Sequence, residues 1–450
     1  MRVLLYLGLS TALLLSLVFA DHHGDHGEQG GHKDCHGKKG EKGDRHHHDH
    51  HHGHHHHDHH HHHHGHHHHH HHHHHSNENL DIYKIAPGNA KFAFDLFREV
   101  AAEHPSENIA FSPLSISVAF ALLSLGARAK TCDQILEGIG FNISQISEKE
   151  IHDGFHHLLE ELNDDDSELS LDTGNGLFIS KAWKILDQFL NDTKELFDSE
   201  AFSVDYQDNE AVKKLINEYV NKNTNGMIPE VLDSVEKETA LILVNYIYFK
   251  GKWEVPFQEQ RTQSGDFHVS DTETVKVPFM SKTGSYKVAY LDDATLVSLP
   301  YKGNASALFI LPTVGKLQDV EANLKDIVKR FKKKNENTFL RLNIPKFSVE
   351  GSLDLKSILP KFGINDLFSN NADLSGITGA PDLKISKAIH KAKIQVDESG
   401  TEAAGTTVIE AVRFSMVLRS LTFDRPFIFA IYSHSTRSTL FLAKIANPAK

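Results

Sequence analysis

The 450-residue chain has little cysteine, tryptophan and methionine, with two, two and four residues respectively. Two cysteines are too few for a disulfide scaffold, so Cys35 and Cys132 either pair with each other, remain free or pair with another chain. The formal net charge of −13 at pH 7, counted with neutral histidine, argues against a nucleic-acid-binding protein, which would carry a basic stripe. We therefore expect a globular protein that depends on a hydrophobic core.

Catalytic motifs are also missing. The chain has no G-x-S-x-G sequence, no phosphate-binding glycine loop and no closely spaced cysteine pair. The nearest candidate is the segment HDGFH at 152–156, in which Asp153 replaces the glutamate of a metalloprotease signature. A helix would place both histidines on one face, but Gly154 weakens that helix and no third ligand is evident. An exposed polar helix face is the favoured interpretation, and we expect a protein that is not an enzyme.

Long apolar runs are absent after the first twenty residues. Residues 3–19 are almost wholly apolar, follow Arg2 and end in Val18-Phe19-Ala20, which is typical of a secretory signal peptide cleaved before Asp21. The run is short for a membrane span and no stop-transfer segment follows, so a membrane anchor is the weaker alternative. We expect residues 1–20 to be a signal peptide and the mature protein to be secreted into the extracellular space, without a membrane or nucleic-acid partner.

Three sequence triplets suit that compartment as acceptors for N-linked sugar. They begin at Asn142, Asn191 and Asn304 and continue as Ile-Ser, Asp-Thr and Ala-Ser. Such triplets also occur by chance, and we expect about two of the three to be glycosylated.

What the sequence has in excess is histidine. Residues 21–75 hold 31 of its 38 histidines and have no apolar face to bury, so we expect a disordered tail. Neutral imidazole binds zinc, copper and nickel, and the tail offers many ligand sets. The first of them are His46, His47, His48, His50, His51, His52, His54 and His55. Protonation at low pH would also make the tail attractive to anionic surfaces. The alternative is an inert repeat expansion.

Residues 76–450 mix helical and strand patterns. Apolar residues at helical spacing precede His104-Pro105, and further amphipathic helices are expected at 187–202 and 210–225. The continuous apolar run 241–249 indicates a strand buried on both faces, and residues 427–432 and 439–445 flank a polar turn that predicts a hairpin. Strands do not alternate regularly with helices, which indicates an α+β fold.

Several segments of this part resemble the serpin superfamily, in the family's order and spacing. They are NIAFSPLSIS at 108–117, LVNYIYFKGKW at 243–253, FSNNADLSG at 368–376, IHKA at 389–392, DRPF at 424–427 and a loop hinge, ESGTEAAGTT, at 398–407. The resemblance covers essentially all of residues 76–450 and implies one α+β serpin domain with three β-sheets, eight or nine helices and an exposed reactive loop. The histidine-rich tail lies outside the family pattern.

The resemblance also implies a function. Such a protein is a serine protease inhibitor, expected here to be a monomer, that has no catalytic residues and requires no cofactor. An extracellular serine protease attacks the loop and forms an acyl-enzyme, and the cleaved loop enters the central sheet and distorts the protease. A non-inhibitory carrier and a metal-binding plasma protein are the alternatives.

The loop itself can be judged for its ability to insert. The resemblance assigns the hinge to Glu398, Gly400, Thr401, Ala403, Ala404 and Gly405. Residues two apart share a face of a strand, and the face from Thr401 to Ala411 has no charge, whereas Glu402 and Glu410 lie on the other face. Insertion would therefore bury no ion, and the hinge has no proline to interrupt a ladder. The alternative is a flexible surface loop with accidental alternation.

Family spacing places the attacked bond sixteen residues after Glu398, between Phe414 and Ser415. Phe414 would fill the apolar primary pocket of a chymotrypsin-like protease. Cleavage after Arg413 by a trypsin-like enzyme, or at Met416 or Leu418 by an elastase-like enzyme, is the alternative.

A set of polar residues is expected beneath the central sheet. Asn245 lies within the apolar run 241–249, where a buried amide needs hydrogen-bond partners. The resemblance groups it with Ser112, Ser115 and His390, at the point where strands part to admit the loop. Four separately satisfied residues are the alternative, but buried polar groups are best satisfied as networks. His390 then has a structural role.

Overall fold

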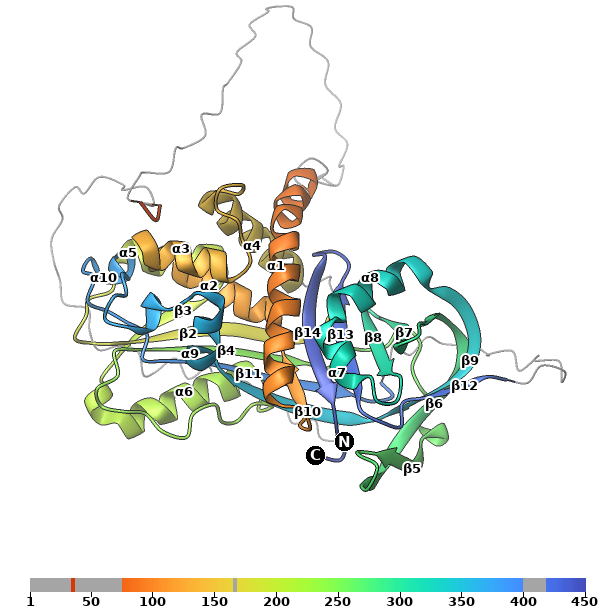
Figure 1. Cartoon of the computed structure of the whole chain (residues 1–450). Helices are drawn as coiled ribbons and strands as arrows, with labels where there is room; N and C mark the ends of the chain where they lie inside the picture. Colours follow the sequence, from red (N-terminus) through yellow and green to blue (C-terminus); the bar gives the residue numbers. More distant parts are fainter. Residues whose placement is uncertain (1–33, 37–74, 165–167, 400–417) are drawn as a thin grey trace, which may run out of the picture.

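The protein is described by a computed structural model for residues 34–36, 75–164, 168–399 and 418–450 (Figure 1). It has the α+β architecture that the sequence predicts, with helices packed around two β-sheets. In these ranges no helix combines the length and apolarity needed to cross a membrane.

Most of the helices precede residue 225. The α-helices are α1 (His75–Glu103), α2 (Pro113–Gly126), α3 (Ala129–Gly138), α4 (Glu148–Asn163), α5 (Asp187–Phe197), α6 (Asn209–Asn223), α7 (Leu317–Ala322), α8 (Leu324–Lys334), α9 (Leu355–Ile358) and α10 (Ser375–Thr378). Short 3-10 turns are η2 (Tyr206–Asp208), η3 (Glu259–Arg261), η4 (Leu359–Phe362) and η5 (Asp366–Phe368). The described ranges therefore hold ten α-helices where we expected eight or nine, because α9 and α10 are single turns of four residues.

The strands form one sheet of five and one of nine. The five-stranded sheet has the order β10 (Phe347–Asp354), β11 (Lys387–Val396), β4 (Leu241–Phe249), β2 (Leu171–Ser180), β3 (Glu200–Val204). The nine-stranded sheet has the order β1 (Ile109–Phe111), β14 (Ser438–Ile445), β13 (Phe427–Ser433), β8 (Ala305–Pro312), β7 (Ala294–Tyr301), β6 (Thr274–Tyr290), β9 (Glu336–Pro345), β12 (Ser420–Thr422), with β5 (Gln263–His268) also paired to β6.

Three sheets were expected, and the described strands form two. The reason is the length of β6, which has 17 residues. Its residues 279–288 pair with β9 and its residues 287–290 pair with β7. This one strand therefore joins two groups of strands into a continuous sheet.

The five-stranded sheet is covered on both faces at β4, whereas β10 and β11 each have one buried face and one exposed or half-buried face. Helices α2 to α5 lie on one side of it and α6 lies on the other (Figure 1). The alternate residues Ile242, Val244 and Tyr246 of β4 pack in the smaller core beneath α6, whereas Leu241, Leu243 and Ile247 belong to the main core. Because both faces of β4 are buried, its sequence is apolar on both faces apart from Asn245.

Two helix starts fix the elements beside this sheet. Ser112 caps α2 by accepting a hydrogen bond from the backbone N–H of Ser115, and Pro113 occupies the first turn. Every residue of α2 is buried. Helix α4 begins with a capping box in which Ser147 and Glu150 satisfy each other's backbone N–H groups. These local signals set where both helices begin.

The two cysteines form a disulfide bond that joins the tail to the folded body. Cys35 lies against the start of α3, where its carbonyl accepts a hydrogen bond from Ala129 N at 2.7 Å, and its own N–H donates to Glu148 Oε2 at 2.9 Å. Both cysteines are buried. The sequence left this pairing open, because no fixed structure was expected anywhere in the tail.

Candidate functional site

The centre of the five-stranded sheet is a pair of parallel strands, β4 and β11. Eight residue pairs join them, from Lys387 opposite Ile242 to Ile394 opposite Phe249. The chain leaves the five-stranded sheet at the end of β11. The next strand that the structure describes is β12, which pairs with β9 in the nine-stranded sheet. The chain between β11 and β12 therefore links one sheet to the other. A chain that turned back from the end of β11 and entered between β11 and β4 would run antiparallel to both.

A row of polar side chains crosses the middle of this sheet. Asn175 of β2 is opposite Asn245 of β4, and Asn245 is opposite His390 of β11. All three are buried in an otherwise apolar layer. Strand register alone places them side by side, at the position where β4 and β11 adjoin.

Hydrogen bonds join this row to the start of α2. The Asn245 amide donates to Asn175 Oδ1 at 2.7 Å and to Ser115 Oγ at 2.8 Å, and its Oδ1 accepts from Nδ1 of His390. The backbone N–H of Ser112 donates to Nε2 of His390 at 3.0 Å. The structure therefore brings the four predicted residues, Ser112, Ser115, Asn245 and His390, into one network.

Both ring nitrogens of His390 are occupied in this network. Nε2 accepts from Ser112 and Nδ1 donates to Asn245, which is the pattern of a neutral imidazole. Burial lowers the pKa of His390 to about 3, because no carboxylate compensates the lost hydration of the charged form. The ring is fully engaged in holding β11 to β4 and to α2.

This buried histidine gives a testable pH dependence. Between about pH 6.5 and pH 3 the unfolded imidazole is protonated and the folded one is neutral, so acidification favours unfolding. We expect a loss of about 1.4 kcal/mol in the free energy of unfolding per pH unit from this group. Urea unfolding between pH 7 and pH 5, above the main range of carboxyl titration, measures it. The slope should become shallower by that amount in His390→Asn, and an equal slope in both proteins would contradict the assignment.

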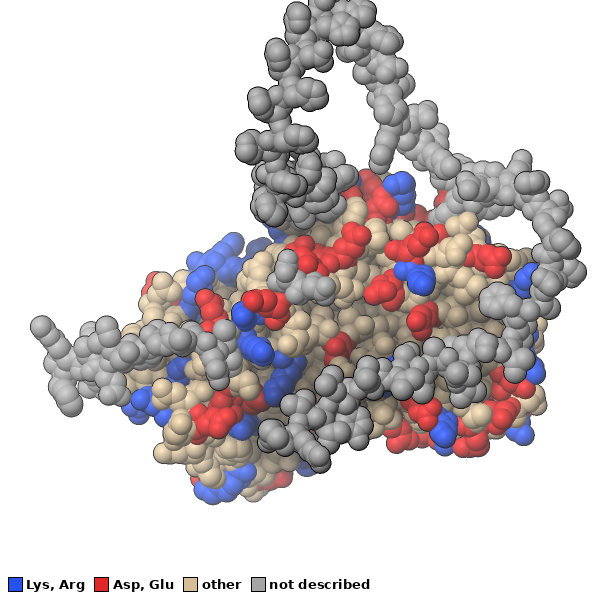
Figure 2. Space-filling model, turned by 180° about the vertical axis from the view of Figure 1, so that it is seen from behind, with Lys and Arg blue, Asp and Glu red and all other residues tan. Residues whose placement is uncertain are grey.

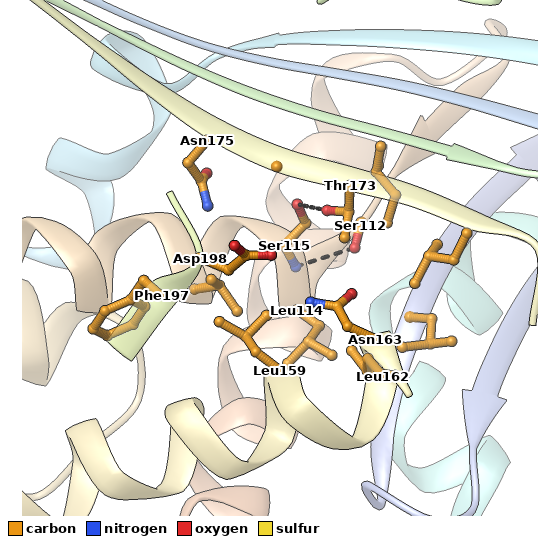
Figure 3. Close-up of a pocket in the computed structure, with 15 residues that line it drawn as sticks. Ser112, Leu114, Ser115, Leu159, Leu162, Asn163, Thr173, Asn175, Phe197 and Asp198 are labelled. Carbon is orange, nitrogen blue, oxygen red and sulfur yellow. Dashed lines mark hydrogen bonds between the residues drawn. The ribbon is translucent and has the colours of Figure 1, made fainter. Parts of the chain in front are cut away.

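A small cavity adjoins the network (Figure 3). Ser115 and Thr173 hydrogen bond across its upper wall at 3.3 Å, with Asn175 beside them, while Leu159 and Leu162 of α4 close it from below. Its volume is about 30 Å³, which is room for a water molecule or two rather than for a ligand. The cavity is loosely packed space between α4 and β2.

The loop is anchored where it leaves β11. Trp253 is buried, and its Nε1 donates to Asp397 O at 2.8 Å while its backbone N–H donates to Ser399 O at 3.1 Å. The Trp253 ring stacks on Tyr301, with ring centroids 4.1 Å apart. Residues 397–399 are therefore held against a rigid aromatic support.

Glu398 completes this anchor. Its carboxylate accepts a hydrogen bond from Thr262 Oγ1 at 2.7 Å and forms an ion pair with Lys346 Nζ at 2.9 Å. Burial raises the pKa of Glu398, but the bonds from Lys346 and Thr262 outweigh burial and hold the pKa below its usual value. Glu398 is therefore an ionised and paired group at the first position of the predicted hinge.

The other predicted site residues fall into two groups. One group lies outside the described residues. It comprises the hinge residues after Glu398, the expected scissile bond between Phe414 and Ser415 with its alternatives, and the histidines His46 to His55 that are expected to bind metal. The acceptors Asn142, Asn191 and Asn304 are all exposed, on the loop after α3, on α5 and in the turn before β8.

The favoured interpretation of the HDGFH segment was wrong for its first histidine. Helix α4 forms across Gly154, whose absent Cβ leaves room for Ile85 of α1. His152 is buried and its Nε2 lies 2.7 Å from Ser124 Oγ, so it does not belong to an exposed face. His156, the second histidine, is half-buried and lies beside the Leu196 carbonyl and the Glu160 carboxylate.

Sequence reasoning missed four residues of the site, Thr173, Asn175, Thr262 and Lys346, and it gave Trp253 only as part of the segment 243–253. Asn175 carried a signal, because an amide between two glycines is unusual in a buried strand. The partners of Glu398 carried none, since Thr262 and Lys346 meet it only through the tertiary fold.

Comparison with known proteins agrees with this architecture. Residues 87–448 match the family described as Serpin (serine protease inhibitor). The chain is 50% identical over 371 residues to alpha-1-antiproteinase 2 of Equus caballus, covering 82% of this chain and 88% of that protein. It is 47% identical over 377 residues to alpha-1-antiproteinase of Callosciurus caniceps, covering 83% and 91%.

Solved structures show the same likeness. Human glycosylated kallistatin matches with a TM-score of 0.75 and 42% identity, covering 82% of this chain and 99% of that chain. Human thyroxine-binding globulin, complexed with its ligand, matches with a TM-score of 0.76 and 39% identity, with the same coverages.

Proposed function

Because the chain belongs to the serpin family of serine protease inhibitors, we propose that it traps an extracellular chymotrypsin- or elastase-like protease by offering residues 400–417 as a suicide substrate. Two features together carry this proposal. In the sequence from Thr401 to Ala411, every second residue is uncharged, so a strand formed there would have one face without charge. The central strands of the five-stranded sheet, β4 and β11, are parallel. A strand of this pattern can enter between β4 and β11 without burying an ion.

The covalent step belongs to the protease. Its serine oxygen attacks the carbonyl carbon of Phe414, the bond to Ser415 breaks, and the amine of Ser415 leaves with the proton. Phe414 remains joined to the protease as an ester. This chain contributes the loop and the position in which residues 397–399 hold it.

Insertion has a defined structural cost. The eight pairs between β4 and β11 must separate, and the bond between His390 and Asn245 must break. Each strand then pairs with the inserted one, so one ladder is replaced by two. The additional ladder and the burial of the uncharged face favour the inserted state.

The scissile bond tests the loop assignment. We expect a panel of chymotrypsin-, elastase- and trypsin-like proteases to release a carboxyl-terminal peptide, and sequencing of that peptide should begin at Ser415. A peptide that begins at Ser415 with a chymotrypsin-like enzyme supports the assignment. One that begins at Phe414, after cleavage at Arg413, would move the target to the trypsin-like class.

A carrier function is the second candidate. The likeness to thyroxine-binding globulin, a ligand-binding protein of the same fold, is the observation that favours it. A carrier would be cleaved in the loop without retaining the protease. Loss of protease activity therefore separates the two functions.

We also propose that the protein is secreted as a monomer with sugar on about two of its three exposed acceptors. Residues 1–20 fit a signal peptide, and the disulfide bond suits an oxidising compartment.

For the tail we propose multivalent binding of zinc, copper or nickel, and of anionic surfaces at low pH. Replacing the histidines of residues 46–74 with serine keeps the tail length and the Cys35–Cys132 bond. We expect this variant to lose most of its zinc capacity in equilibrium dialysis and to inhibit protease as well as the unmodified protein. Retained capacity would place the metal sites in the folded body instead.

A further inference from the structure

Helix α4 brings three potential metal ligands together on the folded body, away from the network described above. One ring nitrogen each of His156 and His157 and a carboxylate oxygen of Glu160 lie within 4.8 Å of one another. We propose that these three residues form a binding site for a single divalent transition metal, such as zinc, on this face of the serpin domain. The set of two imidazoles and one carboxylate is one that zinc accepts.

The orientation of His156 supports a cation at this place. Its Nδ1 lies 3.3 Å from the carbonyl oxygen of Leu196, at the end of α5. A neutral ring that donates there presents the lone pair of Nε2, which lies 3.3 Å from Oε1 of Glu160. A lone pair and a carboxylate oxygen repel each other unless a positive charge lies between them. A metal ion that binds both would remove this repulsion.

His157 has the corresponding arrangement on the side of α1. Its Nδ1 lies 3.1 Å from Oδ2 of Asp81, at ion-pair distance but without the geometry of a hydrogen bond. Turning the ring so that Nδ1 donates to Asp81 would leave Nε2 for a metal. An outer oxygen that holds Nδ1 and leaves Nε2 for the metal is the usual support of histidine ligands in zinc sites. Asp81 and the Leu196 carbonyl are positioning groups for the two histidines.

The helix makes the geometry robust. Glu160 is four residues after His156 and three after His157, so its carboxylate neighbours both histidines on the helical surface. Both histidine side chains are mostly buried, whereas that of Glu160 is 57% exposed and can turn toward an ion. Water can complete a tetrahedral shell. Acidic side chains gather at the end of the molecule where α1 and α4 lie (Figure 2), which favours a cation there.

This site can be measured in the presence of the tail because it exists only in the folded protein. The sequence predicts that the tail has no fixed fold, so metal bound there does not distinguish folded from unfolded chains. A ligand that binds the folded state alone raises the melting temperature. Thermal unfolding of the full chain therefore reports on the α4 site.

The test is the melting temperature of the full chain with zinc chloride at about 100 times the dissociation constant and above the tail capacity. We expect a rise of about 3–6 °C. The double variant His156→Ala, His157→Ala should lose this rise, and so should Glu160→Gln, which is an isosteric change at an exposed position. His104→Ala is the matched control, because His104 is exposed beside a single carboxylate, Glu107. It should respond like the unmodified protein.

Two results of this melting experiment would overturn the proposal. The first is an absence of any zinc-dependent rise in the unmodified chain. The second is an equal rise in the unmodified chain and in Glu160→Gln. Anomalous diffraction at the zinc edge from crystals of the full chain provides an independent measurement, with a peak expected between Nε2 of His156 and the Glu160 carboxylate. If no zinc peak appeared there on the serpin domain, the proposed site would be contradicted, even if zinc stabilised the protein.

Discussion

Replacing Thr401 with arginine should convert the protein from an inhibitor into a substrate. In the proposed insertion, Thr401 is the first residue whose side chain turns toward the core, so arginine there would bring a charge beneath the sheet at a cost of several kcal/mol, about the penalty of an uncompensated buried ion. Insertion would then be slower than release of the protease. Titration of protease activity should show the number of inhibitor molecules consumed per protease rising at least about tenfold, since 1.4 kcal/mol already corresponds to a factor of ten.

The neighbouring residue supplies the control. Glu402→Arg introduces the same side chain on the opposite face, which already carries Glu402 and Glu410. We expect this variant to keep an unchanged stoichiometry. If Thr401→Arg inhibits as well as Glu402→Arg does, the assignment of the two faces is wrong.

Removing the amide of Asn245 should destabilise the protein more than any surface change of equal size. Asn245→Ala leaves Nδ1 of His390 and Oδ1 of Asn175 buried without their partner. Each unsatisfied buried group costs about 1–3 kcal/mol, so we expect a loss of roughly 2–5 kcal/mol. The melting temperature should fall by several degrees, and β4 should separate from β11 more readily.

Asn337→Ala provides the comparison for this substitution. Asn337 lies at an exposed position of β9, and its truncation should change stability by less than about 0.5 kcal/mol. Thermal unfolding of both variants measures the difference. Equal melting temperatures would show that Asn245 does not hold the network together.

The sequence predicts the parts of the fold that local patterns dictate. The run 241–249 is β4, and the hairpin expected near the carboxyl terminus is β13 and β14. The helix expected at 187–202 is shorter, because Asp198 adopts a left-handed conformation and ends α5 at Phe197. Residues 200–204 then pair with β2 as strand β3. Pairing with a strand distant in sequence overrode the helical pattern.

The same limit applies to the site. The family resemblance identified Ser112, Ser115, Asn245 and His390, and the structure places them in contact. Asn175 joins them through the register of β2 with β4, which no single-sequence pattern states. The Cys35–Cys132 bond likewise depends on three tail residues that pack against α3, a contact that composition could not predict.

The most direct test of the inhibitor proposal is denaturing electrophoresis after incubation with a chymotrypsin-like serine protease. The proposal predicts a one-to-one complex that survives boiling in detergent, in which the protease serine is esterified to Phe414. The loss of protease activity should match the amount of complex. Complete cleavage within residues 400–417, with fully active protease and no complex for any enzyme of the panel, would contradict the proposal and favour the carrier function.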